Sequence, residues 1–195
     1  MHKNKPDNKV VNLLEIINHK KRALEGSEKN DLQHLLKEAH KLSQNVSTLH
    51  KDITPVTQEE AVAIIRISLV AELKKSGGLN SASFLCATYA ANLLTELFYK
   101  TPKYWTAFDF LEESTRKRNP YIMQKGADMC FLISSFFTGR GDWRTMKLSY
   151  YRSMGIGLYF SFYSQTKREI GLHMSENFLF ISDIANKGLE TIKHT

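Results

Sequence analysis

The sequence predicts an all-α protein, a helical bundle of about eight helices that begins with an N-terminal helical hairpin. Apolar residues recur at spacings of three and four along almost the whole chain, which is the helical period. No run of alternating apolar and polar residues is long enough to indicate a strand. The four prolines, Pro6, Pro55, Pro102 and Pro120, all stand at the ends or boundaries of the expected helices. The 195 residues, 42% of them hydrophobic, have a globular composition that excludes a disordered or fibrous chain.

Residues 1–52 are expected to form a heptad-patterned helical hairpin. We expect Gly26 to end its first helix, and Asn30 or Asp31 to cap the second. Apolar residues of the second helix alternate spacings of three and four, as in a coiled-coil seam: Leu32, Leu35, Ala39, Leu42, Val46 and Leu49. This seam either packs onto the rest of the chain or receives a helix of a partner or of a second copy, with Leu35 and Leu42 as contact residues.

Residues 57–195 are expected to form the main bundle. Thr57 and Glu60 have the spacing of a capping box, Gly77 is expected to end the helix that follows, and Ser81 to cap the next one. Helices are expected at about 58–76, 81–100, 102–111, 120–138, 149–165 and 168–192. The helices at 120–138 and 149–165 are apolar on all sides, which predicts a central pair surrounded by the others.

Three glycines lie inside this predicted central pair, namely Gly126, Gly155 and Gly157. A glycine within a helix costs about 1 kcal/mol of stability relative to alanine. The cost is tolerable where the missing side chain lets a neighbouring backbone or aromatic ring come close, so we expect such contacts at these positions.

The basic residues gather in three clusters at expected turns, 116–118, 140–147 and 167–168. The formal charge of the chain is +7, and residues 114–168 hold ten basic but only two acidic residues. Because the central helices are expected to be antiparallel, the clusters form two poles at opposite ends of the pair. Candidate contact residues for an acidic protein partner are Arg116, Arg118, Arg140, Trp143, Arg144 and Lys147. Nucleic-acid binding is an alternative, although a nucleic-acid groove favours one continuous basic face with aromatic residues.

Asp128 stands in an otherwise apolar stretch, where a carboxylate is costly unless it is paired or hydrogen-bonded. The expected partners come from the next helix: Tyr150, Tyr151, Arg144 or Arg152. The favoured interpretation is a structural bond between the central helices, with Asp128, Tyr150 and Tyr151 as buried polar residues. The other interpretation is an acid or base with a shifted pKa in a pocket, which would make the protein an enzyme.

No catalytic, metal-binding or cofactor motif accompanies Asp128 in the sequence. His34 and His40 do not share a helix face, and HExxH, CxxC, G-x-S-x-G and phosphate-loop patterns are absent. We therefore expect no metal, no cofactor and no enzymatic activity. The chain shows no secretory signal and no apolar run long enough to span a membrane. Cys86 and Cys130 lie in apolar stretches, as buried thiols do in a reducing compartment, so the expected location is the cytoplasm.

The stretch 128–159 carries a distinctive series of residues: Asp128, Ser134, Phe136, Phe137, Tyr150, Tyr151, Met154, Gly155 and Tyr159. Their spacing resembles an uncharacterised family of small bacterial helical proteins, with the pattern D-x-x-L-x-x-S-G-F-F, a short basic loop, and Y-Y-x-x-M-G-x-x-A-Y. Phe131, Ser135 and Leu158 stand where the family has Leu, Gly and Ala. The resemblance covers about the second half of the chain; it implies a helical fold and no particular chemistry.

The sequence therefore predicts a non-enzymatic protein-protein interaction protein, such as an adaptor or accessory subunit of a larger bacterial complex. Two observations favour this function, the heptad seam and the clustered basic residues, together with the lack of a catalytic motif. The alternatives are a nucleic-acid-binding helical protein that uses the basic clusters, and an enzyme with a pocket around Asp128.

Overall fold

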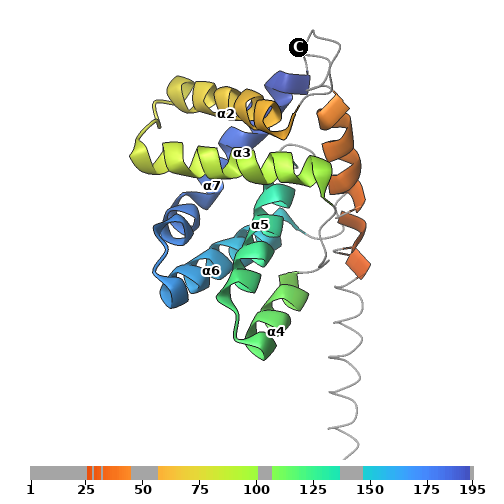
Figure 1. Ribbon diagram of the computed structural model, residues 1–195, viewed down its shortest axis with the longest axis vertical. Helices are drawn as coiled ribbons and strands as arrows, with labels where there is room; N and C mark the ends of the chain where they lie inside the picture. The colour runs from red at the N-terminus through yellow and green to blue at the C-terminus, as the bar shows by residue number, and fades with distance from the viewer. Residues whose placement is uncertain are drawn as a thin grey trace, which may run out of the picture.

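The computed structural model describes residues 26, 27, 29–31, 33–44, 57–100, 107–136 and 147–193. These residues form helices, with no strand among them, which confirms the all-α prediction (Figure 1). An N-terminal helix, α1, contains the described residues between 26 and 44. The other helices are α2 (Gln58–Lys75), α3 (Ser81–Tyr99), α4 (Ala107–Lys117), α5 (Pro120–Phe136), α6 (Leu148–Thr166) and α7 (Glu169–Lys193). The described residues thus hold seven helices instead of about eight.

The turn predicted around Gly26 is not formed. Gly26, Ser27, Lys29, Asn30 and Asp31 are all helical, so the expected end of one helix and start of another is wrong at this place. A helix tolerates one glycine at a cost of about 1 kcal/mol when the residues around it favour the helix. The helix predicted before Gly26, and the end of the heptad seam at Val46 and Leu49, lie outside the described residues.

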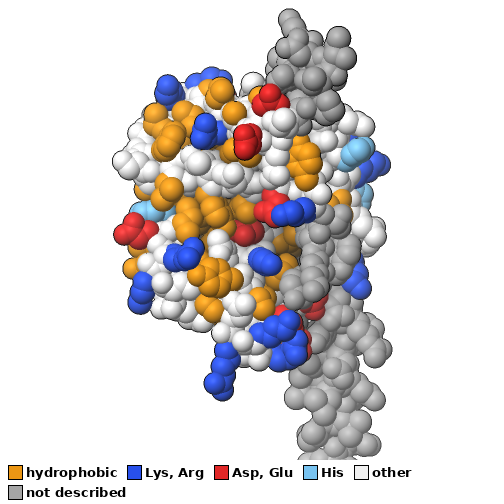
Figure 2. All heavy atoms as spheres, viewed as in Figure 1, with side chains coloured by type: hydrophobic (Ala, Val, Ile, Leu, Met, Phe, Trp, Pro, Cys, Tyr) orange, Lys and Arg blue, Asp and Glu red, His pale blue; other side chains and the backbone are white. Residues whose placement is uncertain are grey.

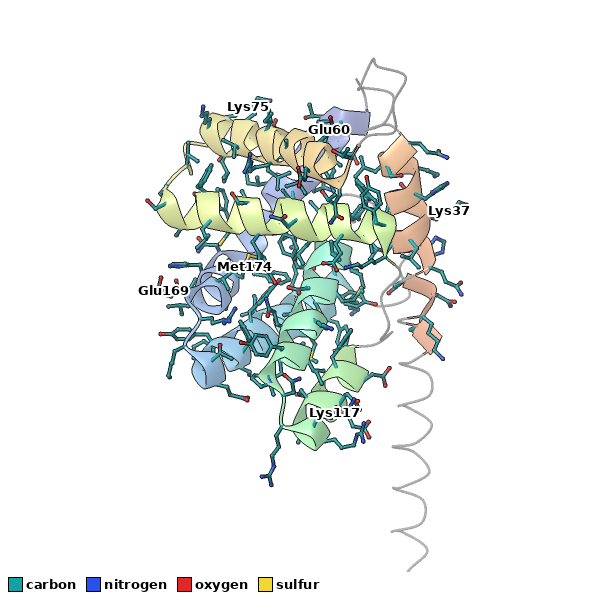
Figure 3. The ribbon with its side chains drawn as sticks, in the orientation of Figure 1. Lys37, Glu60, Lys75, Lys117, Glu169 and Met174 are labelled. Carbon is teal, nitrogen blue, oxygen red and sulfur yellow. The ribbon has the colours of Figure 1, made fainter. Side chains whose placement is uncertain are left out.

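The described part of the heptad seam packs onto the main bundle. Leu35, Ala39 and Leu42 are fully buried and belong to the same hydrophobic core as residues of α2–α7. Lys37, on the opposite face of α1, is exposed and points away from the bundle (Figure 3). At one end of the seam, the Tyr151 hydroxyl donates a 2.7 Å hydrogen bond to Oδ2 of the fully buried Asp31. Asp31 therefore joins α1 to α6 instead of capping a helix.

Local signals set several of the helix ends. Thr57 and Glu60 form the predicted capping box, with Thr57 N donating to Glu60 Oε2 over 2.8 Å. The α2 helix ends at the predicted turn, where Gly77 has a φ of +68°, a value that L residues rarely adopt. The cap of α3 differs from the prediction: Asn80, and not Ser81, is the N-cap, and it exchanges hydrogen bonds with Ser83.

Helices that follow one another in the chain pack as antiparallel neighbours: α2 with α3, α4 with α5, α5 with α6, and α6 with α7. The long α7 runs behind the others in the view of Figure 1 and packs against α2, α3, α5 and α6. Helix α5 is buried without interruption from 129 to 136, as the prediction of a surrounded helix requires. Helix α6 does pack closely on α5, but it keeps an exposed face, and Phe160 is 54% exposed. The two predicted helices therefore do pack on each other, but α6 is not surrounded on all sides as the prediction for 149–165 requires.

Two of the three glycines in the predicted central pair make close contacts. A Cβ on Gly155 would lie 2.6 Å from Cζ of Phe178 and 3.0 Å from Cβ of Cys130, and a Cβ on Gly126 would lie 2.7 Å from Cβ of Phe110. Gly157 is exposed and has no atom near its missing Cβ, so its expected contact is absent. The glycines at 126 and 155 therefore set the distance between packed helices, while Gly157 only weakens α6.

The two glycines of α6 provide a matched test of this packing. We expect Gly155→Ala to destabilise the protein by about 1–3 kcal/mol, because the new methyl group meets the buried Phe178 ring. We expect Gly157→Ala to stabilise it by about 0.5–1 kcal/mol, because it removes backbone entropy from the unfolded chain at an open site. Urea unfolding of both variants measures the two effects, and equal effects would contradict the assigned contact.

The Asp31–Tyr151 hydrogen bond gives a second test. We expect Tyr151→Phe to lower the free energy of unfolding by about 1–3 kcal/mol, because it removes a donor from a buried carboxylate. Tyr163→Phe, in the same helix but partly exposed, is the control and should change stability by less than about 0.5 kcal/mol. If both variants unfold at the same urea concentration, the bond does not hold α1 on the bundle.

Candidate functional site

A pocket of about 590 Å³ opens between α3, α4 and α5. The apolar part of its lining comes from Leu93, Leu97, Phe110, Tyr121, Met129 and Leu132, and the polar part from Tyr89, Asn92, Glu96, Lys100, Gln124, Lys125 and Asp128. On the face seen in Figure 2, hydrophobic side chains gather just below α3, with acidic and basic groups beside them. The surface of the pocket is thus mainly apolar, although seven polar residues contribute to its lining.

Asp128 is the centre of the polar group. Its Oδ1 accepts a 2.7 Å hydrogen bond from the Tyr89 hydroxyl of α3 and a 2.6 Å hydrogen bond from the Tyr159 hydroxyl of α6. Nε2 of Gln124 donates to the Tyr89 hydroxyl over 2.7 Å. The two tyrosine rings meet edge to face at 6.4 Å, which holds both hydroxyls in place. Asp128 therefore joins three helices at the wall of the pocket.

The tyrosines that bind Asp128 are not the predicted ones. Tyr151 donates to Asp31 of α1, and the ring of Tyr150 packs against that of Tyr151 at 5.2 Å. Because α5 and α6 are antiparallel, the middle of α5 faces the later turns of α6, and Asp128 reaches Tyr159 there. Asp128 thus joins α5 to α3 through Tyr89 and to α6 through Tyr159. That this bond is purely structural stays a prediction.

Burial raises the pKa of Asp128 from 3.8 to about 7. The hydrogen bonds from Tyr159 and Tyr89 and the charge of Lys125 act in the opposite direction, and the charge of Glu96 raises the pKa further. Burial and the charge of Asp128 also raise the pKa of both tyrosines, which therefore stay protonated as donors. Near neutral pH the pocket wall consequently holds a carboxyl group that exists in both charge states.

The rim of the pocket carries exposed charges. Lys100 pairs with Glu96 at 3.1 Å, and the Lys100 side chain is 72% exposed. Lys125 is also exposed. Both lysine side chains are therefore hydrated, whereas Oδ1 of Asp128 is held by the hydroxyls of Tyr89 and Tyr159.

The other candidate residues lie away from this pocket or outside the described residues. Leu35 and Leu42 are in the core. Arg116 binds Glu113 at 2.6 Å, and Arg118 and Lys147 are exposed. Arg168 lies over the Tyr121 ring at 5.3 Å, so the clusters at 116–118 and 167–168 meet at one end of α5, as predicted. Arg140, Trp143 and Arg144 lie outside the part that the structure describes.

Tyr89, Glu96 and Gln124 of the pocket lining were missed in the sequence, and so was Tyr159, which binds Asp128. Tyr89 and Glu96 are seven residues apart, and so they share one face of an otherwise apolar α3, which was a detectable signal. Nothing in the sequence shows that this face of α3 meets Asp128, because the contact joins residues 39 positions apart.

Within the described residues, no group of three His, Cys, Asp or Glu side chains is arranged to hold a metal ion. None of the helices searched in that part of the chain is both long and apolar enough to cross a membrane. Cys86 and Cys130 are both buried thiols, as predicted.

No protein-family model, curated protein or solved structure matches this chain. The resemblance of 128–159 to an uncharacterised bacterial family therefore stays a prediction. Assignment of function must start from the pocket itself.

The raised pKa of Asp128 predicts a pH dependence of stability. A carboxyl group whose pKa is higher in the folded than in the unfolded chain stabilises the fold only while it is protonated. We therefore expect the protein to lose stability as pH rises from about 4 to 7, the window between the two pKa values. The variant Asp128→Asn cannot ionise and should lack this part of the loss.

The measurement is the melting temperature of both proteins between pH 4.5 and 8. The difference, wild type minus Asp128→Asn, should decrease by a few degrees as pH rises and level off above about pH 7. Two curves that stay parallel would show that the Asp128 pKa is not raised.

Proposed function

We propose that this protein binds a small organic ligand in the pocket between α3, α4 and α5. The observation that carries the proposal is Asp128, a hydrogen-bonded carboxylate placed in the wall of a mainly apolar pocket. Small-molecule sites have volumes of about 300–1,000 Å³, apolar walls and a few polar groups that orient the ligand. A carboxyl group with a strongly shifted pKa in such a cleft also favours a functional site over a purely structural bond.

Proton-transfer catalysis at Asp128 is a second candidate function. A pKa of about 7 suits a general acid or base at neutral pH, where both protonation states are populated. The groups next to Asp128 are tyrosine hydroxyls that keep their protons, and among the described residues no serine, cysteine or histidine lines the pocket. Ligand binding explains these residues with fewer requirements than a reaction does, so we place it first.

The adaptor function predicted from the sequence stays a prediction, and so do nucleic-acid binding, an acidic protein partner and a cytoplasmic location. The burial of Leu35 and Leu42 weakens the case for a partner helix, or for a second copy, on the heptad seam. The exposed Arg118 and Lys147 still favour an acidic partner at the ends of the bundle. A small ligand in the pocket is compatible with either role.

A fragment screen with a blocked pocket tests the proposed function. Neutral, cationic and anionic aromatic fragments are screened against the full chain by ligand-observed NMR. The variant Leu93→Trp places an indole ring on the pocket wall, and the variant Ile67→Trp places the same ring on an exposed site of α2. We expect fragments that bind the wild type and Ile67→Trp alike, but Leu93→Trp at least tenfold more weakly.

Thermal unfolding of the three proteins verifies that they are folded at the temperature of the screen. If no fragment distinguishes Leu93→Trp from Ile67→Trp, the pocket does not bind small molecules.

A further inference from the structure

The carboxyl group in the wall of the pocket can accept further hydrogen bonds, but the hydroxyl donors beside it are already engaged. The Tyr89 and Tyr159 hydroxyls both donate hydrogen bonds to Oδ1 of Asp128, and one amide N–H of Gln124 donates to the Tyr89 hydroxyl. Among the described residues, no group donates a hydrogen bond to the second oxygen, Oδ2, although a carboxylate accepts about four hydrogen bonds. A ligand that satisfies this wall must therefore bring hydrogen-bond donors to Asp128.

The charges around the pocket favour a positive donor. Glu96 of α3 places a second carboxylate in the same lining, and its charge acts on Asp128. The lysines of the lining stand at the rim: Lys100 is bound to Glu96, and Lys125 is exposed. The charges of Glu96 and Lys125 oppose each other at Asp128, whereas a cation in contact with Asp128 in an apolar environment is strongly attracted.

The rest of the lining requires an apolar body. Leu97, Phe110, Met129 and Leu132 line the pocket between α3, α4 and α5, and the Tyr121 ring adds a partly exposed aromatic wall. Each apolar group of a ligand that leaves water here contributes about 25 cal/mol per Å² to binding. A bare inorganic cation would leave this surface uncovered.

We infer that the pocket selects an amphipathic organic amine, whose ammonium group binds Asp128 and whose apolar body packs on Leu97, Phe110 and Met129. This inference rests on the proposed ligand-binding function and names the chemical class of the ligand. The ammonium group donates to Oδ2 of Asp128 and gains from the charge of Glu96. The apolar body fills the space under α3 and α4.

Binding of an amine to Asp128 depends on pH. The charged and titratable groups that act on this carboxyl are Tyr89 and Glu96 of α3, Tyr159 of α6 and Lys125 of α5. Only the ionised carboxylate attracts an ammonium group. An alkylammonium group has a pKa of about 10, so it keeps its proton at neutral pH. With an Asp128 pKa of about 7, the binding-competent fraction grows about tenfold between pH 6 and 8.

The test compares three probes that share one phenylethyl body: 2-phenylethylamine, 2-phenylethanol and 3-phenylpropionate. Isothermal titration of the full chain at pH 8 should show the amine binding at least tenfold more tightly than the alcohol and the carboxylate. The affinity for the amine should fall about tenfold from pH 8 to pH 6, while the affinity for the alcohol stays constant.

Charge variants of the pocket give the matched controls. Asp128→Asn should remove most of the preference for the amine and its pH dependence. Glu96→Gln lies at the exposed rim, leaves the core intact, and should weaken amine binding severalfold. Lys125→Gln removes a positive charge from the same lining and should leave amine binding unchanged or strengthen it. Should Asp128→Asn fail to fold, the pH series and the two rim variants still decide the question.

The outcomes separate this inference from the proposed function. Equal or tighter binding of the alcohol or the carboxylate would overturn the amine assignment and leave a ligand-binding pocket. If the amine does not bind but neutral fragments of the screen do, the amine assignment is also overturned and the ligand-binding pocket remains. Failure of every fragment in the blocked-pocket screen would overturn both.

Discussion

The contact between the Phe178 ring and Gly155 is the constraint on which the rest of the structure depends. No side chain separates α6 from α7 at this point, so the ring of Phe178 enters between α5 and α6. There it packs against Phe131 at 5.7 Å and against Tyr159 at 6.1 Å. Tyr159 in turn donates to Asp128. A packing contact in the core thereby positions a hydrogen bond in the pocket wall.

Asp128 shows how the fold accommodates a costly group. Burial disfavours the ionised carboxylate, and two tyrosine hydroxyls from different helices recover part of that cost. Because burial raises the pKa of Asp128 more than the hydrogen bonds lower it, this carboxyl group changes its charge near neutral pH.

The basic clusters are distributed differently on the surface of the molecule than along the sequence. The basic clusters at 116–118 and 167–168 are far apart in the chain, yet Arg168 stacks on Tyr121 at the start of α5. Glu113 neutralises part of this end by pairing with Arg116 and Lys117. The net charge of the cluster is therefore lower than the count of its basic residues, and attraction of an acidic partner there is correspondingly weaker.

Local signals in the sequence determined the helices of the described main bundle and several of their ends. The capping box at Thr57, the glycine turn after α2 and Pro120 at the start of α5 act on residues within one turn, so they are readable without a fold. The same holds for Asp128 as an unusual carboxylate. Helix α6 was misjudged because its apolar residues cover both a buried and an exposed face, and periodicity does not tell which face has a neighbour.

Only the tertiary structure decided which residues meet. It gave Asp128 the hydroxyls of Tyr89 and Tyr159, it gave Tyr151 to Asp31, and it buried Leu35 and Leu42 in the main core. The residues in these contacts lie between 31 and 120 positions apart in the chain, and the packing of the helices brings them together. The sequence by itself determined that a bundle forms around an unusual acid. The packing of helices determined that this acid lines a pocket, because a pocket is a relation between elements and no single helix encodes it.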